Sequence, residues 1–280
     1  MRLVVHGGVG SPPVEPAARG AALDAAASAG ARERTPLDAV ERAVRRLEDD
    51  ERFNAGVGSA LQADGVARTD AGLMTSDGRV GAACAMSGVA RAVSVARVVL
   101  AETPHVLVAG EGAVRLADAA GMPTDADLTT ERTRERYAAA DPPPGDGPHL
   151  DWVRERFGGS DTVGAVAADG ERYAAATSTG GRWFALAGRV GDVPQTGAGF
   201  YCTPAGGASA TGAGEAIARV GLARRAVGTL ERGLDAGDAA AHAVETFAES
   251  TGETAGVIVL GPDGVGRAHN GEAMATATVE

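Results

Sequence analysis

The stretch from Gly158 to Gly181 constrains the fold of this 280-residue chain more than any other. Thr162 stands where a glycine-flanked loop gives way to the apolar run 163–168, which is typical of a buried strand. Asp169-Gly170 is a two-residue turn signal, and residues 173–177 follow as a return strand. The pattern therefore predicts a β-hairpin in which Thr162 heads a core strand.

Thr162 has two interpretations at this point. Threonine favours strands, so a structural role alone would account for it. Alternatively, the peptide bond between Asp161 and Thr162 is cut, and Thr162 becomes a new N-terminus. A threonine hydroxyl is a weak nucleophile, but a free α-amine with a pKa of about 7.7–8.0 can take its proton. The rest of the chain decides between the two.

Composition excludes several functional classes. The formal net charge is −11, whereas nucleic-acid binding needs a basic surface. No apolar run is long enough for a membrane span, and the N-terminal strand turns to glycine too early for a signal peptide, so we expect a cytoplasmic protein. All side-chain cations other than histidine are arginines, which is compatible with a salt-adapted source. Cys84 and Cys202 are isolated and the histidines lack ligand spacing, so we expect neither a disulfide framework nor a zinc site.

Apolar periodicity predicts strands and helices on both sides of a polar linker at about 124–158. The expected strands outside the hairpin are residues 2–6, 67–74, 79–86, 106–109, 257–260 and 266–270, and the expected helices are residues 16–31, a helix from 36 to about 47, and residues 89–102, 112–120, 212–230 and 236–250. This order suits a sheet sandwich covered by helices on both faces. Gly7 to Gly10 predicts a tight turn that brings backbone close to a site. Pro12-Pro13 disfavours a dinucleotide-binding interpretation of these glycines, because it denies the helix that would bind pyrophosphate.

Two further segments offer groups that would bind an α-amino acid. Arg189 lies among glycines and is a candidate clamp for a carboxylate, and Asp192 could hold an ammonium group. Thr211-Gly212, where a glycine-rich loop is expected to meet a helix N-terminus, offers a hydroxyl and N–H groups suited to an oxyanion. Taken singly, each has a structural alternative, a surface salt bridge or a helix cap.

An acidic run and the loop after it suggest a cation site. The run, residues 48–51, is followed by a short loop that ends at Gly58. Such a run is usually a solvated face. Free carbonyls beside carboxylates nevertheless suit a hard cation held by oxygen ligands.

Together these motifs resemble those of the plant-type asparaginase and isoaspartyl peptidase family of N-terminal nucleophile (Ntn) hydrolases. The motifs that carry the resemblance span nearly the whole chain: His-Gly-Gly-Val-Gly at 6–10, Phe-Asn-Ala-Gly-Val-Gly at 53–58, Pro-His-Val at 104–106, Gly-Glu-Gly-Ala at 110–113, Asp-Thr-Val-Gly-Ala-Val-Ala at 161–167, Thr-Ser-Thr-Gly-Gly at 177–181, Gly-Arg-Val-Gly-Asp at 188–192 and Thr-Gly-Ala-Gly-Glu at 211–215.

The resemblance implies a fold and a maturation route. The fold would be a single domain over residues 1–280, an α/β four-layer αββα sandwich of the Ntn-hydrolase type. The precursor would cut itself between Asp161 and Thr162 into an α subunit of residues 1–161, with a flexible linker at about 124–158, and a β subunit of residues 162–280. The mature unit would be an (αβ)₂ dimer of heterodimers.

The resemblance also implies roles for individual residues. Thr162 would be the nucleophile and, through its amine, the base, and Thr179 would support it. Thr211 and Gly212 would form the oxyanion hole, and Asn54 would lie near the site. Two motifs would supply the substrate contacts, which are Arg189, Val190, Gly191 and Asp192 from the first and Thr211, Gly212, Ala213 and Gly214 from the second. The segment 47–57 matches the family's sodium-binding loop, whose ligands, mostly carbonyl oxygens, would come from Leu47, Glu48, Asp50, Phe53, Ala55 and Val57. We expect Na⁺ or K⁺ there and no organic cofactor.

The implied reaction is hydrolysis of the side-chain amide of L-asparagine, or of a β-aspartyl peptide, through an ester on Thr162 that water resolves to L-aspartate. Glycosylasparaginases tend to carry Thr-Ser-Thr-Asn-Gly where this chain has Thr-Ser-Thr-Gly-Gly at 177–181, which favours asparagine and isoaspartyl substrates. A glycosylasparaginase-like hydrolase and an uncleaved amino-acid-binding homologue remain as alternatives. The segment 182–187 departs from the family pattern, which leaves substrate preference open, and the Gly159-Ser160-Asp161 flank predicts slow cleavage.

Overall fold

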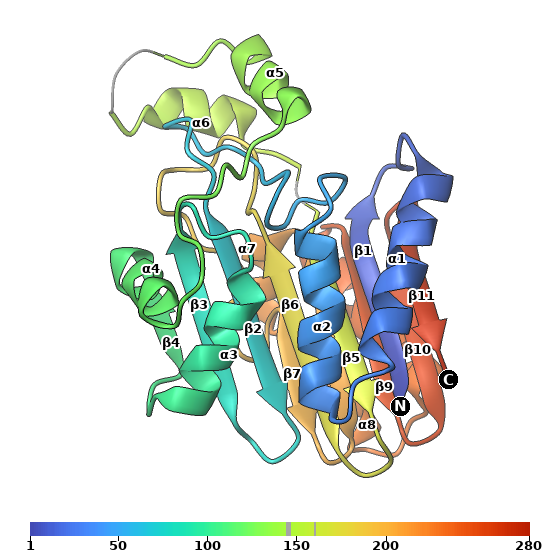
Figure 1. Cartoon of the computed structure of the whole chain (residues 1–280). Coiled ribbons are helices and arrows are strands. Elements are labelled where there is room, and N and C mark those ends of the chain that lie inside the picture. The colour runs from blue at the N-terminus through green and yellow to red at the C-terminus, as the bar shows by residue number, and fades with distance from the viewer. Residues whose placement is uncertain (144–146, 160) are drawn as a thin grey trace.

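The computed structural model describes residues 1–143, 147–159 and 161–280, so that Ser160 of the predicted flank lies outside the described residues. The described elements form four layers, with helices, two sheets and helices in succession (Figure 1). This arrangement confirms the predicted αββα sandwich.

The larger sheet is built around the predicted hairpin. Its strands, in spatial order, are β11 (Ala273–Val279), β1 (Arg2–Gly10), β5 (Val163–Ala168), β6 (Tyr173–Thr179), β2 (Thr69–Thr75), β3 (Val80–Met86) and β4 (Leu107–Ala109). The described neighbours pair antiparallel except β3 and β4, which pair parallel. The turn between β5 and β6 includes Gly170 at φ 111°, as the Asp-Gly signal predicts. The hairpin is therefore central in its sheet.

The smaller sheet packs against the inner face of the larger one. Its strands, in spatial order, are β10 (Gly264–His269), β9 (Ala255–Gly261), β8 (Gly206–Gly212) and β7 (Phe200–Thr203), and all of them pair antiparallel. Small residues let the two sheets approach. A Cβ added at Gly72 would lie 2.1 Å from the Phe200 ring. The abundance of glycine thus has a packing role at this interface.

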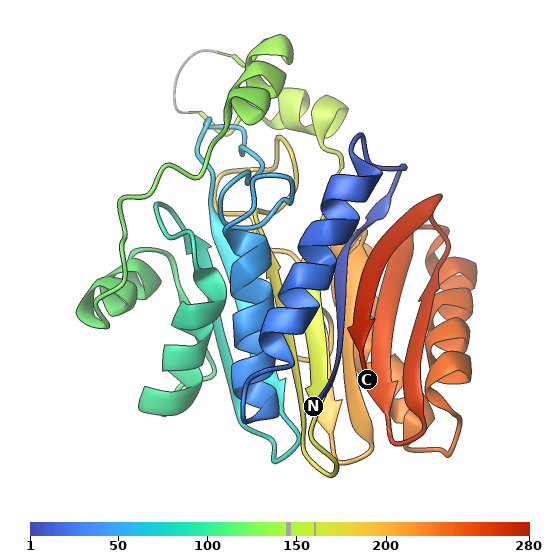
Figure 2. The same ribbon diagram turned by 45° about the vertical axis from the view of Figure 1, so that its right-hand side comes forward.

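Helices cover both outer faces (Figure 2). The larger sheet is covered by α1 (Pro16–Gly30), α2 (Pro36–Glu48) and α3 (Ala92–Glu102), with α4 (Gly110–Ala119) near its β4 edge, and the smaller sheet by α8 (Leu222–Leu230) and α9 (Ala236–Thr251). The predicted start of α2 is confirmed, because the Thr35 hydroxyl accepts a hydrogen bond from the Asp38 N–H at 3.2 Å. None of the helices among the described residues combines the length and apolar character that crossing a bilayer requires.

Side chains alternate between the two faces of a strand, so β5 contributes residues to two hydrophobic cores. Val163 packs toward the helices that cover the larger sheet, whereas Val166 packs between the sheets with Phe200 and Ile258. Side chains at even positions of β5 therefore face the second sheet. Thr162, one residue before the strand, shares this parity.

Several sequence predictions are corrected by the structure. The helix expected over 212–230 is interrupted: β8 ends at Gly212, α7 (Gly214–Val220) follows, and Gly221 at φ 70° separates α7 from α8. Residues 7–10 do not form a turn but continue β1, with a register shift between His6 and Val9. The polar segment 124–158 contains two helices, α5 (Glu131–Ala139) and α6 (Leu150–Arg156), which lie beyond one end of the sandwich in Figure 1.

Candidate active site

Three buried threonines, two at the ends of strands and one directly before a strand, lie at one end of the space between the sheets. Thr162, Thr179 and Thr211 are each at most 3% exposed. Strand parity turns Thr179 of β6 inward with Tyr173, and Thr211 of β8 inward, because Ala208 and Ala210 face the outer helices. Thr211 thus lies within a strand and not in the loop that the sequence predicted, because pairing with β9 extends β8 to Gly212.

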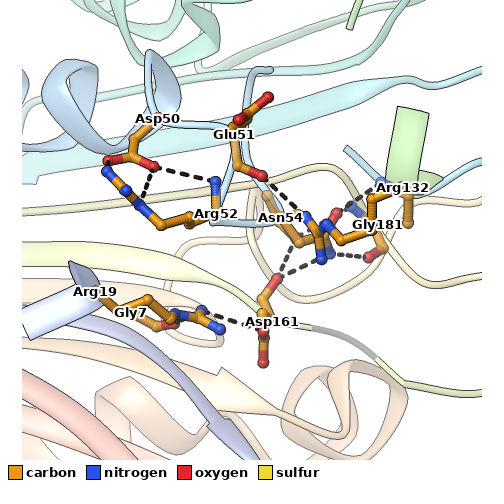
Figure 3. Close-up of polar contacts among 11 residues, drawn as sticks. Gly7, Arg19, Asp50, Glu51, Arg52, Asn54, Arg132, Asp161 and Gly181 are labelled. Carbon is orange, nitrogen blue, oxygen red and sulfur yellow. Dashed lines mark hydrogen bonds and ion pairs between the residues drawn. The ribbon is translucent and has the colours of Figure 1, made fainter. Parts of the chain in front are cut away.

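The carbonyl oxygen of Asp161, directly before Thr162, accepts two side-chain hydrogen bonds. Asn54 Nδ2 donates to it at 3.0 Å (Figure 3), and Thr179 Oγ1 donates to it at 3.1 Å. The amide of Asn54 is itself fixed, because its Oδ1 accepts from the Ala60 N–H at 2.7 Å and its Nδ2 also donates to the Gly181 carbonyl at 2.7 Å. Two positioned donors on one carbonyl polarise it and stabilise negative charge on its oxygen.

The side chain of Asp161 is held as well. Arg19 Nη2 lies 3.3 Å from Asp161 Oδ2 and donates to the Gly7 carbonyl at 2.9 Å, while the guanidinium stacks 4.8 Å over the Phe53 ring. Gly8 has φ 106°, and a Cβ there would lie 2.8 Å from Asp161 Oδ1. The glycines at 7–8 therefore do bring backbone close to the site, although they form a strand irregularity and not a turn.

Arg189 and Asp192, the predicted zwitterion grip, meet at Gly214. A Cβ at Gly214 would lie 2.6 Å from Asp192 Oδ1 and 2.9 Å from Arg189 Nη2. Among the described residues, Asp192 Oδ2 and the buried Thr211 hydroxyl have no hydrogen-bond partner, whereas Arg189 Nη2 lies 2.7 Å from Glu215 Oε1 in an ion pair. Unpartnered buried polar atoms are rare, so Asp192 Oδ2 and the Thr211 hydroxyl are suited to bind a ligand.

Glu215 orients Arg189. Its Oε1 accepts from Arg189 Nε at 2.7 Å, and its Oε2 accepts from Arg182 Nη1 at 2.8 Å. Burial alone would raise the pKa of Glu215, but Arg189 and Arg182 lower it overall. Burial dominates at Asp192 and raises its pKa to about 7, against the pull of its own backbone N–H and of Arg189. Asp192 thus lacks a full counter-charge.

The remaining predicted substrate contacts surround this grip. Gly191 is close-packed on the Arg189 guanidinium, where an added Cβ would lie 2.7 Å from Nη2. Ala213 and Gly212 line a neighbouring cavity, and Gly212 takes φ 134°. Val190, which lies between Arg189 and Asp192 in the sequence, is half-buried. The two predicted motifs are therefore brought together around Gly214.

Sequence reasoning missed Asp70, a buried acid beside this grip. Asp70 is the second residue of β2 and lies opposite Thr179, and its Oδ1 accepts from the Ala85 N–H at 2.7 Å. Burial raises its pKa to about 7, and the nearby Arg189 opposes that rise. The sequence signal that could have indicated Asp70 is a single aspartate within a segment expected to form a strand, because aspartate is rarely buried without a role.

His6 is a second residue whose part in the site was not predicted. Its Nε2 lies 2.8 Å from Ser209 Oγ, between the sheets, and β1 pairs it with Gly164 of β5. Burial lowers its pKa to about 3, so the ring is neutral near physiological pH. The imidazole therefore contributes a polar contact to Ser209 between the sheets, and it carries no charge there.

The predicted cation loop offers mostly main-chain oxygens. The Glu48 carboxylate is held by Oε1, which accepts from Ser178 Oγ at 2.6 Å and from the Val93 N–H at 2.9 Å, whereas its buried Oε2 has no hydrogen-bond partner among the described residues. Asp50 binds Arg52 through both carboxylate oxygens. A Cβ at Gly58 would lie 2.5 Å from the Glu51 carbonyl oxygen and 2.9 Å from that of Phe53. Carbonyl oxygens thus crowd the loop.

Side-chain metal ligands are not clustered in the parts of the chain that the structure describes: no group of three or more His, Cys, Asp or Glu residues there is arranged to hold a metal ion. The carbonyl oxygens of Leu47, Glu48 and Asp50 already accept backbone hydrogen bonds, from the N–H groups of Asp50, Val57 and Phe53. Each carbonyl has a second lone pair, so the loop suits a weakly held monovalent cation better than a divalent one.

The segment 182–187, which departs from the family pattern, forms a small aromatic core. Trp183 and Phe184 are buried against Trp152 of α6 and Tyr137 of α5, with the Trp152 and Phe184 rings edge to face at 5.3 Å. Phe184 takes φ 59°. These aromatic side chains attach the two helices of segment 124–158 to the loop beside Arg189.

Comparisons with known proteins show the family of the chain. The profile of the family described as Asparaginase matches residues 1–280. A plant-type L-asparaginase of Pyrococcus abyssi is 39% identical over 294 residues, which cover 98% of this chain and 95% of the relative. A plant-type L-asparaginase of Pyrobaculum calidifontis is 41% identical over 288 residues, with the same coverage. An isoaspartyl peptidase/L-asparaginase of Rattus norvegicus is 39% identical over 241 residues, 81% of this chain and 68% of the relative.

Proposed function

Because the chain belongs to the asparaginase family, we propose that it is a self-cleaving threonine amidohydrolase that hydrolyses the side-chain amide of L-asparagine and the isoaspartyl bond of β-aspartyl peptides. One observation carries the proposal. The buried Asp192 Oδ2 and Thr211 hydroxyl lack partners in the described chain and match the ammonium group and the developing oxyanion of one substrate, while the adjacent Arg189, which Glu215 orients, matches its carboxylate.

Maturation would begin at the held peptide bond. Thr162 Oγ attacks the Asp161 carbonyl carbon and gives up its proton, while Asn54 and Thr179 stabilise the oxygen that becomes negative. The C–N bond then breaks, the Thr162 nitrogen leaves as an amine with that proton, and an ester joins Asp161 to Thr162. Water hydrolyses the ester. The products are an α subunit of residues 1–161 with a new carboxylate and a β subunit of residues 162–280 with a free amine.

Turnover would use the liberated amine. It takes the hydroxyl proton of Thr162 as Oγ attacks the side-chain carbonyl carbon of the substrate, and the oxyanion accepts hydrogen bonds at Thr211 and Gly212. The proton passes to the leaving nitrogen, and ammonia or an amino acid departs. Water, activated by the same amine, then attacks the ester and releases L-aspartate. Arg189 and Asp192 hold the aspartyl part throughout.

We also propose an alkali cation, Na⁺ or K⁺, at the loop 47–58. The carbonyl oxygens that would hold it belong to residues of the predicted set Leu47, Glu48, Asp50, Phe53, Ala55 and Val57. Its chemistry would be charge compensation for crowded carbonyl dipoles, not catalysis. Asn54 lies in this loop. A cation that holds the loop in place would therefore also hold the Asn54 side chain that donates to the Asp161 carbonyl.

The resemblance supports an (αβ)₂ assembly, and we also propose a cytoplasmic location. Sedimentation of the cleaved protein would test the assembly, with a mass of two α and two β chains expected.

Ammonia release from L-asparagine, together with leucine release from β-Asp-Leu, tests the proposed activity. The cleaved wild-type protein should hydrolyse both, and Thr162→Ala should hydrolyse neither. Calorimetric binding of asparagine or aspartate to an intact chain that never turns over would instead favour an uncleaved binding protein.

A further inference from the structure

A cavity of about 490 Å³ opens over the Asp161 end of the site. Asn54, Asp161 and Gly212 line it, so it reaches the residues around Thr162, but Arg189 and Asp192 are not part of its wall. If the aspartyl part of a substrate is gripped at Gly214, the bond to be cut lies at the other end of that part. The leaving group then projects into this cavity.

The rim of the cavity is basic although the protein is acidic. Five arginines line it, Arg19, Arg52, Arg132, Arg136 and Arg182, against two acids, Asp161 and Glu253. The whole chain carries a net charge of −11, so composition does not explain this concentration of positive charge. Two of the five are neutralised by fixed partners, because Arg52 pairs with Asp50 and Arg182 with Glu215.

Arg132 and Arg136, one helical turn apart on α5, have no carboxylate partner among the described residues. Arg132 donates to the Glu51 carbonyl oxygen at 2.8 Å, and Arg136 stacks 4.2 Å over the Trp183 ring. Burial lowers the pKa of Arg136, the like charge of Arg132 adds to this effect, and Asp161 opposes it. Positive charge is thus held at the rim without a direct ion pair to either arginine from the described residues.

Cleavage would free a third arginine. Arg19 pairs with the Asp161 side chain in the intact chain. A substrate carbonyl must take the place of the Asp161 carbonyl at Thr162, so Asp161 has to leave its position once the bond is cut. Arg19 then loses its carboxylate while its contacts with Gly7 and Phe53 keep it at the rim.

Helix α5 has anchors that do not depend on the cut bond. Tyr137 packs in the aromatic cluster with Phe184, and its hydroxyl donates to the Ala63 carbonyl at 2.9 Å. Arg132 and Arg136 are therefore expected to stay at the rim of the mature enzyme.

We propose that these three arginines, Arg19, Arg132 and Arg136, form a leaving-group site that selects β-aspartyl peptides in which an acidic residue follows the isoaspartate. Such a leaving group carries an α-carboxylate and a side-chain carboxylate, which match the uncompensated guanidinium groups. The inference rests on the proposed function.

The test compares kcat/KM for β-Asp-Glu and β-Asp-Gln, which differ only in the side-chain charge of the leaving residue. Cleaved wild-type protein should prefer β-Asp-Glu by about tenfold at low ionic strength, and the preference should shrink with added salt. Arg132→Gln/Arg136→Gln should bring the ratio close to one. Arg134→Gln is the matched control, because Arg134 lies on the same helix and pairs with Asp127 outside the cavity.

A wild-type ratio near one, or a ratio that the double variant leaves unchanged, would overturn the inference while hydrolysis of β-Asp-Gln and asparagine upholds the proposed function. Failure of the wild type on all three compounds would overturn both. If removal of Arg136 from Trp183 unfolds the protein, Arg132→Gln alone should lower the ratio about threefold, and Arg136→Lys should preserve it.

Discussion

The side-chain nitrogen of Asn54 lies 3.0 Å from the carbonyl oxygen of Asp161, in a chain where 107 positions separate the two residues. The same carbonyl accepts from Thr179, and the Asp161 side chain is paired with Arg19. The peptide bond before Thr162 is therefore held by residues from three separate segments. Such convergence on one backbone carbonyl fits a bond that the protein itself cuts.

Loss of the Thr179 donor should slow cleavage. Thr179→Val keeps the size and β-branching of the side chain but removes the hydroxyl that donates to the Asp161 carbonyl. Removing one oxyanion donor costs about 10²–10³ in rate, so we expect a decrease of that order. Conversion of the intact chain into two fragments, followed by gel densitometry, measures it. Thr179→Ser retains the donor and should cleave within a few-fold of wild type; equal rates for Val and wild type would contradict the assignment.

Asp192→Asn should weaken substrate binding without affecting cleavage. The substitution preserves shape but replaces the unpartnered Oδ2 with an amide that cannot pair with an ammonium group. A charge-assisted hydrogen bond contributes about 1.5–3 kcal/mol, which corresponds to a 10- to 100-fold loss in kcat/KM for asparagine, mostly through KM. Steady-state kinetics on fully cleaved protein measure this. Asp77→Asn, in an exposed turn, should match wild type.

The kcat/KM for asparagine should rise with pH through about 7. Burial raises the pKa of Asp192 to about 7, so below that pH the carboxyl is protonated and carries no charge for the ammonium group. As pH rises through 7 the proton leaves and binding improves, which gives an ascending limb. In Asp192→Asn this part of the limb should disappear, leaving only the titration of the Thr162 amine. An unchanged limb in the variant would assign it to another group.

The local parts of this fold could be predicted from the sequence. The hairpin around Asp169-Gly170 and the capped start of α2 at Thr35 depend on neighbouring residues, and both are confirmed. Strand β8 was missed because its residues 206–212 are small and glycine-rich, and it owes its strand form to pairing with β7 and β9. Strand β11 was missed as well, and it exists through pairing with β1 at the other end of the chain.

The site was only partly predictable for the same reason. Motifs indicated Arg189 and Asp192, and both lie at Gly214. Asp70, Glu215 and Arg19 were not assigned roles, because each depends on a contact that only the folded chain creates. The helices of 124–158 were hidden by polar composition, since α5 and α6 bury few residues of their own and dock on Trp183 and Phe184.

Exchange of alkali cations for a cation too large for the loop should destabilise the protein. Dialysis from Na⁺ into choline at equal ionic strength should lower Tm by several degrees if a bound cation stabilises the folded state by about 1 kcal/mol or more. Readdition of Na⁺ or K⁺ should restore Tm. Gly58→Ala is the loop control, because a Cβ would meet the Glu51 carbonyl at 2.5 Å, and it should abolish the response to the cation. An identical Tm in choline would contradict the proposed site.

The measurement closest to the central claim is the intact mass and N-terminal sequence of the purified protein after incubation at neutral pH. We predict two chains, of which the smaller begins Thr162-Val163, and a single uncut chain for Thr162→Ala. A wild-type protein that hydrolyses asparagine while its chain stays whole, or that is cut at a different bond, would contradict the claim that Thr162 acts through its own liberated amine.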